Sequence, residues 1–73
     1  MQNGPTLPSK LRLYKGWFSY HGELHTFYTY ASSPLQAKEF MYRQMAEELG
    51  TSAYSLRNYF AQHPLAQSIK EEL

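Results

Sequence analysis

Aromatic and polar residues alternate along two runs in the first half of the chain. The runs cover residues 11–20 and 23–31, and only His21-Gly22 separates them. Runs rich in aromatic residues and threonine, joined by a two-residue link that ends in glycine, are typical of a β-hairpin. Gly22 accepts a positive φ without steric cost, and histidine tolerates the left-handed region better than most residues. The pattern therefore predicts a hairpin with a tight turn.

Pairing Tyr20 with Glu23 and counting outward assigns each strand residue to one of two faces, and both faces are aromatic. An antiparallel sheet needs only one face for its core. We expect the core face to be the one that carries Tyr14, Phe18 and Phe27. The other face is interrupted by polar residues and should stay available to a partner. It carries Lys15, Trp17, Ser19, Thr26, Tyr28 and Tyr30.

A helix is predicted over residues 34–49, which contain no glycine and only the proline that starts the segment. Ser33 suits the N-cap, Pro34 the first helical position, and Gln36 completes a capping box. Apolar residues recur every four positions along the segment, as on the buried face of an amphipathic helix. Gly50 suits the left-handed position that ends a helix.

The pattern after Gly50 predicts a shorter helix over residues 53–62, capped by Thr51 or Ser52 and ended by His63-Pro64. Residues 65–73 are expected to form a frayed C-terminal helix. The fold expected is α+β, a hairpin packed on a long helix and followed by a shorter one (ββαα). The alternative is a third strand in place of the second helix (ββαβ). Residues 1–9 are expected to be a flexible arm and residues 10–73 a single domain.

Size and composition narrow the classes of function. The chain has 73 residues and no cysteine, and leucine, isoleucine and phenylalanine supply only about 19% of it. So small a core makes dimerisation, or docking on a partner, an expectation. The missing cysteines exclude a disulfide framework and favour an intracellular, cytoplasmic location. No segment resembles a signal peptide or a membrane span, so we expect no membrane partner.

Chemistry at an active site is not indicated. The chain has three histidines but neither aspartate nor cysteine, and none of these histidines stands in a pattern typical of metal ligands. No nucleophile, base and orienting group occur together, and no glycine-rich phosphate loop is present. We expect a binding module without enzyme activity, cofactor or metal.

The segment from Tyr42 to Phe60 resembles the helix-turn-helix motif of small transcription factors. Ala46 matches the small residue where the two helices cross, Gly50 matches the turn, and Leu56 and Tyr59 match the buried face of the second helix. The resemblance implies that exposed residues of the second helix meet DNA base edges, since arginine can bind guanine and asparagine adenine. Those residues are Ser52, Ala53, Tyr54, Arg57 and Asn58.

The first 22 residues carry three positive charges and no acid, whereas the remainder has a net charge of −2. A basic front end favours contact with phosphate. The leading hypothesis is a nucleic-acid-binding regulator of phage or mobile-element type. The phage or mobile-element origin is suggested by the small size, the missing cysteine and the compact motif. Its candidate contacts are Lys10, Arg12, Lys15, Ser52, Tyr54, Arg57 and Asn58.

The exposed hairpin face supports a second hypothesis. Trp17, Tyr28 and Tyr30 lie beside Lys15, and aromatic faces beside a cation stack on unpaired bases. Tryptophan and tyrosine also anchor protein interfaces. The alternative to the DNA-binding regulator is therefore a protein-interaction module or inhibitor that uses this face. In either case we expect that the chain can form a homodimer.

Overall fold

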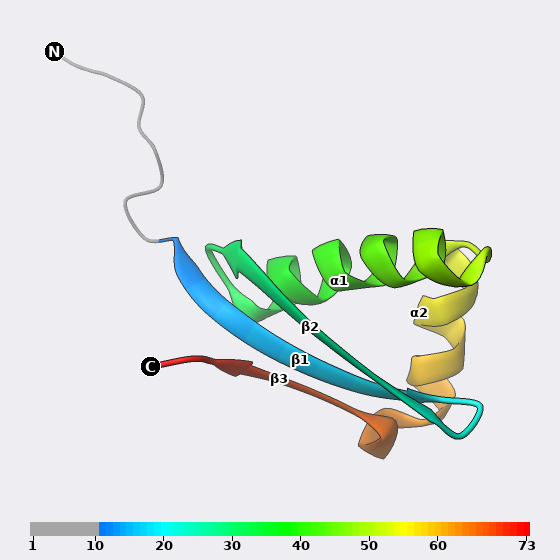
Figure 1. The fold of residues 1–73 in the computed structure, drawn as a ribbon. Helices are drawn as coiled ribbons and strands as arrows, with labels where there is room; N and C mark the ends of the chain where they lie inside the picture. The colour runs from blue at the N-terminus through cyan, green and yellow to red at the C-terminus, as the bar shows by residue number, and fades with distance from the viewer. Residues whose placement is uncertain (1–10) are drawn as a thin grey trace, which may run out of the picture.

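The computed structural model describes residues 11–73 and shows a three-stranded antiparallel sheet with two helices (Figure 1). The expected arm over residues 1–9 and the candidate contact Lys10 lie outside the described residues. The predicted α+β class is confirmed, with hairpin, long helix and shorter helix in the expected order. The elements are β1 (Arg12–Tyr20), β2 (Glu23–Ala31), α1 (Pro34–Leu49), α2 (Ala53–Gln62), the 3-10 turn η1 (Pro64–Ala66) and β3 (Gln67–Glu71).

The hairpin has the predicted register, from the Tyr20–Glu23 pair beside the turn to the Arg12–Ala31 pair at the open end. His21 and Gly22 both adopt positive φ, at 50° and 83°. This is the backbone of a primed two-residue turn, whose twist matches that of the strands. The Tyr59 hydroxyl of α2 accepts a hydrogen bond of 3.3 Å from the His21 amide, so the turn is also attached to the second helix.

Side-chain caps fix the start of α1. The Ser33 hydroxyl accepts a hydrogen bond of 3.1 Å from the Gln36 amide, as expected for an N-cap. The Gln36 side chain does not complete the reciprocal capping box with Ser33. Its Oε1 atom instead accepts hydrogen bonds from the backbone and the hydroxyl of Ser32, at 2.8 and 3.1 Å. The cap is thus shared by two serines.

The short link between the helices carries a helix cap at each end. Gly50 lies in the left-handed region with φ of 69° and donates its amide to the Ala46 carbonyl. Ser52 rather than Thr51 caps α2, and its hydroxyl accepts a hydrogen bond of 3.0 Å from the Ser55 amide. The second helix therefore begins and ends where the sequence predicts.

The expected C-terminal helix over residues 65–73 is wrong. After η1 the chain forms β3, which pairs antiparallel with β1 and makes β1 the central strand. A segment of this length has little helical stability by itself, and Glu71 and Glu72 oppose the dipole at the end of such a helix. The free edge of β1 offers hydrogen-bond partners to one side of the same backbone. The final strand of the ββαβ alternative thus forms after the second helix instead of replacing it.

The core lies between α1 and one face of the sheet, and α2 closes the end nearest the hairpin turn (Figure 1). Tyr14, Phe18 and Phe27 are buried, as predicted for the core face of the hairpin. Within residues 11–73, neither helix is long and apolar enough to cross a membrane. The other side chains of the buried core are Ala31, Ala37, Met41, Tyr42, Met45, Ala46, Leu56 and Phe60.

Gly16 sets how closely α1 approaches the sheet. It lies at the middle of β1, between Phe27 on β2 and Ile69 on β3. A Cβ atom here would collide with the Met41 sulfur and lie 2.9 Å from Cδ1 of Ile69. Met41 is fully buried and has no solvent space into which to move. Met41 therefore occupies the space that a side chain at position 16 would fill.

We expect Gly16→Ala to destabilise the fold by about 1–3 kcal/mol, because it overpacks the contact between α1 and the central strand. Urea unfolding followed by circular dichroism measures the loss. In a Met41→Ala background the same substitution should cost less, since the colliding sulfur is gone. An unchanged unfolding midpoint in the single variant contradicts this account of Gly16.

Candidate functional site

One face of the sheet is left open, because α1 covers only the other face (Figure 1). The strict alternation of the hairpin and of β3 determines which side chains it carries. This surface is called the open face below. Its residues are Leu13, Lys15, Trp17 and Ser19 on β1, Leu24, Thr26, Tyr28 and Tyr30 on β2, and Ser68 and Lys70 on β3.

Three aromatic rings of the open face are accessible to a partner. Trp17, Tyr28 and Tyr30 have exposed fractions of 37%, 53% and 64%. On the core face the rings of Tyr14, Phe18 and Phe27 are almost fully buried. Aromatic side chains usually supply the apolar contacts of a core, so exposed rings gathered on one face make it a candidate binding surface. The predicted division of the hairpin into a buried and an available aromatic face is confirmed.

Two lysines lie directly opposite each other on the open face. Lys15 on β1 pairs with Lys70 on β3. The Lys15 ammonium lies 5.8 Å from the centroid of the Tyr28 ring, within the range of a cation–π contact. Like charges in directly opposed positions destabilise a sheet. The nearest acid by register is Glu72, whose amide donates to the Leu13 carbonyl at 2.8 Å, one position beyond the strand.

Sequence reasoning missed Lys70 because residues 65–73 were expected to be helical. The alternation of Gln67, Ile69 and Glu71 with Ser68 and Lys70 could have indicated a strand, although the segment holds a single β-branched residue. Gln67 supports β3 from the core side, where its Oε1 accepts a hydrogen bond of 2.7 Å from the Tyr42 hydroxyl. Burial raises the pKa of Tyr42, against the lowering effect of this hydrogen bond.

The basic residue Arg12 does not join the open face. It lies on the α1 side of the sheet by alternation, and its guanidinium is 3.5 Å from the carboxylate of Glu71. Of the basic residues predicted at the front of the chain, the structure therefore places only Lys15 on the open face. Lys10 lies outside the described residues.

The candidate residues of the second helix differ in whether they already form contacts within the protein. Arg57 forms two hydrogen bonds with the carboxylate of Glu39 on α1, at 2.8 and 3.2 Å. The hydrogen bond from Arg57 lowers the pKa of Glu39, and the carboxylate in turn raises the pKa of Arg57. The Ser52 hydroxyl caps its own helix. Tyr54 and Asn58 are exposed.

These positions do not form one surface with Lys15. Arg57 is attached to α1, which packs on the core side of the sheet, while Lys15 lies on the open face. A duplex bound along α2 would therefore not reach Lys15 on the same side of the sheet. The basic front of the chain and the second helix have to be considered as separate candidate surfaces.

The histidines lie in separate segments of the described chain. Within the part of the chain that the structure describes, no three histidine or carboxylate side chains gather where they could hold an ion. The Nε2 atom of His25 is buried without a hydrogen bond, although a Glu23 carboxylate oxygen lies 3.5 Å away. His21 and His63 both pack against the ring of Tyr59.

Comparison with known proteins identifies no relative. No family model, no curated protein and no solved structure matches the chain. Its function has to be inferred from the surfaces described above.

The Glu39–Arg57 pair should make stability depend on pH. Because the folded chain lowers the pKa of Glu39, the carboxylate stabilises the fold above its unfolded pKa, and this contribution is lost as the pH falls through the lowered value. The difference in unfolding free energy between the natural chain and Glu39→Gln should be largest near neutral pH and shrink in acid. Urea unfolding at neutral pH and in acid tests this. Glu48→Gln on the same helix is the control and should show no such change. A difference that does not change with pH contradicts it.

Proposed function

We propose that the protein is a non-enzymatic binding module that takes single-stranded nucleic acid on the open face of its sheet. The observation that carries the proposal is the opposed pair of Lys15 and Lys70 next to exposed aromatic rings. Glu71 and Glu72 line the same hollow, but among residues 11–73 neither lysine forms a salt bridge, and an unbridged pair of like charges favours an anionic ligand between them. A phosphate bound there would offset the repulsion between the two lysine ammonium groups in the free protein.

The rings of the open face suit bases that are not stacked in a duplex. Tyr28 and Tyr30 are two residues apart on one strand, so their positions are separated by roughly 7 Å. Bases of a single strand can spread along such a row and stack on successive rings. Because every base has a π face, binding of this kind tolerates many sequences. Trp17 on the neighbouring strand extends the row beside Lys15.

The second helix is less suited to carry the binding. The donors of Arg57 that would contact guanine are directed to Glu39, and the hydroxyl of Ser52 accepts from its own helix. Tyr54 and Asn58 alone provide few of the contacts that a recognition helix needs. The helix-turn-helix resemblance and the phage or mobile-element regulator stay predictions, and binding of duplex DNA through α2 is an outcome that the experiments below can detect.

A protein ligand is the second candidate for the same surface. Leu24 on the open face is 67% exposed, and apolar atoms of Trp17 and Leu65 border a shallow hollow next to η1. An exposed leucine and a hollow beside a tryptophan favour an apolar side chain of a partner more than a phosphate. A protein ligand should therefore depend on Trp17 and Leu24 but not on the two lysines.

Salt dependence tests the role of the lysines. We expect binding of a labelled oligothymidylate, measured by fluorescence anisotropy, to weaken with salt, with a slope of about −1.4 in log K against log[salt] for two phosphate contacts. The variant Lys15→Gln/Lys70→Gln should lose most of this slope. Lys38→Gln on α1 removes a charge from another surface and should leave it unchanged. Equal slopes in the double variant and the natural chain contradict the proposal.

Stacking is tested by single aromatic substitutions. Tyr28→Ala should weaken oligothymidylate binding by about 1–3 kcal/mol, the contribution of one stacked base. Tyr54→Ala, which removes an exposed tyrosine of α2, is the matched control and should have no effect. If Tyr54→Ala or Arg57→Gln weakens binding and Tyr28→Ala does not, the ligand lies on the second helix and the open face is not the site.

A further inference from the structure

The outer edge of β2 is unpaired within the described residues 11–73. The sheet order places β2 at one edge, β1 in the centre and β3 at the other edge. β2 is nine residues long and contains no lysine, proline or glycine, and its one acid, Glu23, is its first residue. Natural sheets usually protect long edges with charges, prolines or bulges. Along most of β2 none of these devices is present.

The hydrogen-bonding groups of this edge can be assigned from the hairpin. The residues that flank a two-residue turn form a hydrogen-bonded pair, so Tyr20 and Glu23 bond to each other and alternate pairs follow. The Leu13 carbonyl confirms this phase, because it accepts from Glu72 on the β3 side. The backbone groups of β2 that point outward therefore belong to Leu24, Thr26, Tyr28 and Tyr30.

The opposite edge differs. β3 has only five residues and ends in Lys70-Glu71, with Glu72 following. Short length and charges at the edge are the means by which natural sheets prevent strand addition. The contrast indicates that β2 is the edge built to receive another strand.

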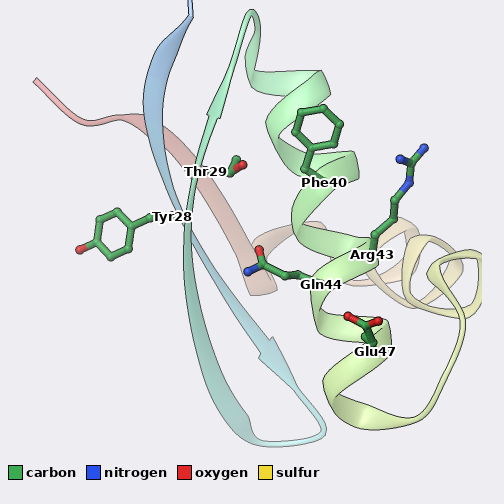
Figure 2. A pocket seen from close by; sticks show the side chains of 6 residues that line it. All are labelled: Tyr28, Thr29, Phe40, Arg43, Gln44 and Glu47. Carbon is green, nitrogen blue, oxygen red and sulfur yellow. The ribbon is translucent and has the colours of Figure 1, made fainter.

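A stripe of α1 runs beside the β2 edge. It consists of Phe40, Arg43, Gln44 and Glu47, which line a hollow together with Tyr28 and Thr29. Figure 2 shows Thr29 directed toward α1 and Tyr28 directed to the other side of the strand. Phe40 is 37% exposed, a large fraction for an aromatic residue of a helix that packs on a sheet. The edge and the stripe form one continuous surface of backbone and side chains.

We propose that this surface binds a second copy of the chain, with the two β2 strands pairing antiparallel about a two-fold axis. A two-fold interface must be complementary to itself. The stripe carries one cation and one anion, and among residues 11–73 neither Arg43 nor Glu47 forms a salt bridge. Across two antiparallel copies of α1, Arg43 of each protomer can approach Glu47 of the other.

The position of the hollow locates the axis. Thr29 and the middle of the stripe, between Arg43 and Gln44, line the same hollow, so one axis can pass beside both. Glu47 of the other protomer is then level with Phe40, three residues or about 4.5 Å along the helix axis from Arg43. On the strands, Thr29 faces Thr29, and Tyr28 of one protomer faces Tyr30 of the other. Threonine pairs and aromatic pairs across strands both stabilise a sheet.

Such a dimer has a continuous six-stranded sheet. Both copies of α1 lie on one side, and both open faces lie on the other, where they form a single surface with twice the aromatic rings and lysines. The edge pairing itself does not depend on what the open face binds. Its test can therefore fail or succeed separately from the proposed function.

Sedimentation velocity of the full chain over a range of concentrations tests the interface. We expect a reversible equilibrium between a species of 8.6 kDa and one of twice that mass. Thr29→Lys places like charges opposite each other at the axis and should abolish the dimer. Arg43→Glu should weaken association by about tenfold or more, because it brings acids together. The swap Arg43→Glu/Glu47→Arg should restore it.

Asn58→Lys, which adds the same charge on α2, is the control for Thr29→Lys and should dimerise like the natural chain. Far-UV circular dichroism of every variant separates loss of association from loss of fold. A chain that stays monomeric up to the concentrations used for NMR overturns the proposal. So does a dimer that survives both Thr29→Lys and Arg43→Glu. Oligothymidylate binding by folded Thr29→Lys reports on the open face of a single protomer, because Thr29 points to the α1 side.

Discussion

The packing around Phe18 holds the three parts of this small domain together. Phe18 is fully buried at the centre of the core, and its ring contacts Phe27 of β2, Tyr42 of α1 and Phe60 of α2. The chain has few aliphatic residues, so rings supply the area that valine and isoleucine provide in most cores. Rings pack well only at certain angles, and this fixes where both helices can lie relative to β1. With both helices placed on one side, the aromatic residues at alternate positions are left exposed on the other.

The local elements were predictable because each depends on near neighbours in the sequence. The two-residue turn determined the hairpin register, and the serines and Gly50 determined the ends of the helices. Which hairpin face is buried followed from the polar residues that interrupt the other. These features depend on alternation and capping, which act over a few residues.

The features that the sequence did not predict depend on contacts between distant residues. β3 forms because β1 has a free edge, and Gly16 matters because Met41 approaches it from α1. Lys70 becomes a candidate site residue only because β3 places it opposite Lys15. Arg57 appeared free to contact DNA, yet the fold brings Glu39 within hydrogen-bond distance of it. The sequence therefore predicted which hairpin rings stay exposed, but not where the charged residues lie relative to them.

If the open face binds the ligand and the second helix does not, the two surfaces should respond differently to oligothymidylate. The most direct measurement is an amide NMR titration of the labelled chain with oligothymidylate at low and moderate salt. We expect salt-sensitive shifts at Lys15, Trp17, Tyr28 and Lys70, with the amides of residues 52–58 unchanged. Shifts confined to Ser52–Asn58, or no shifts even at low salt, would contradict it.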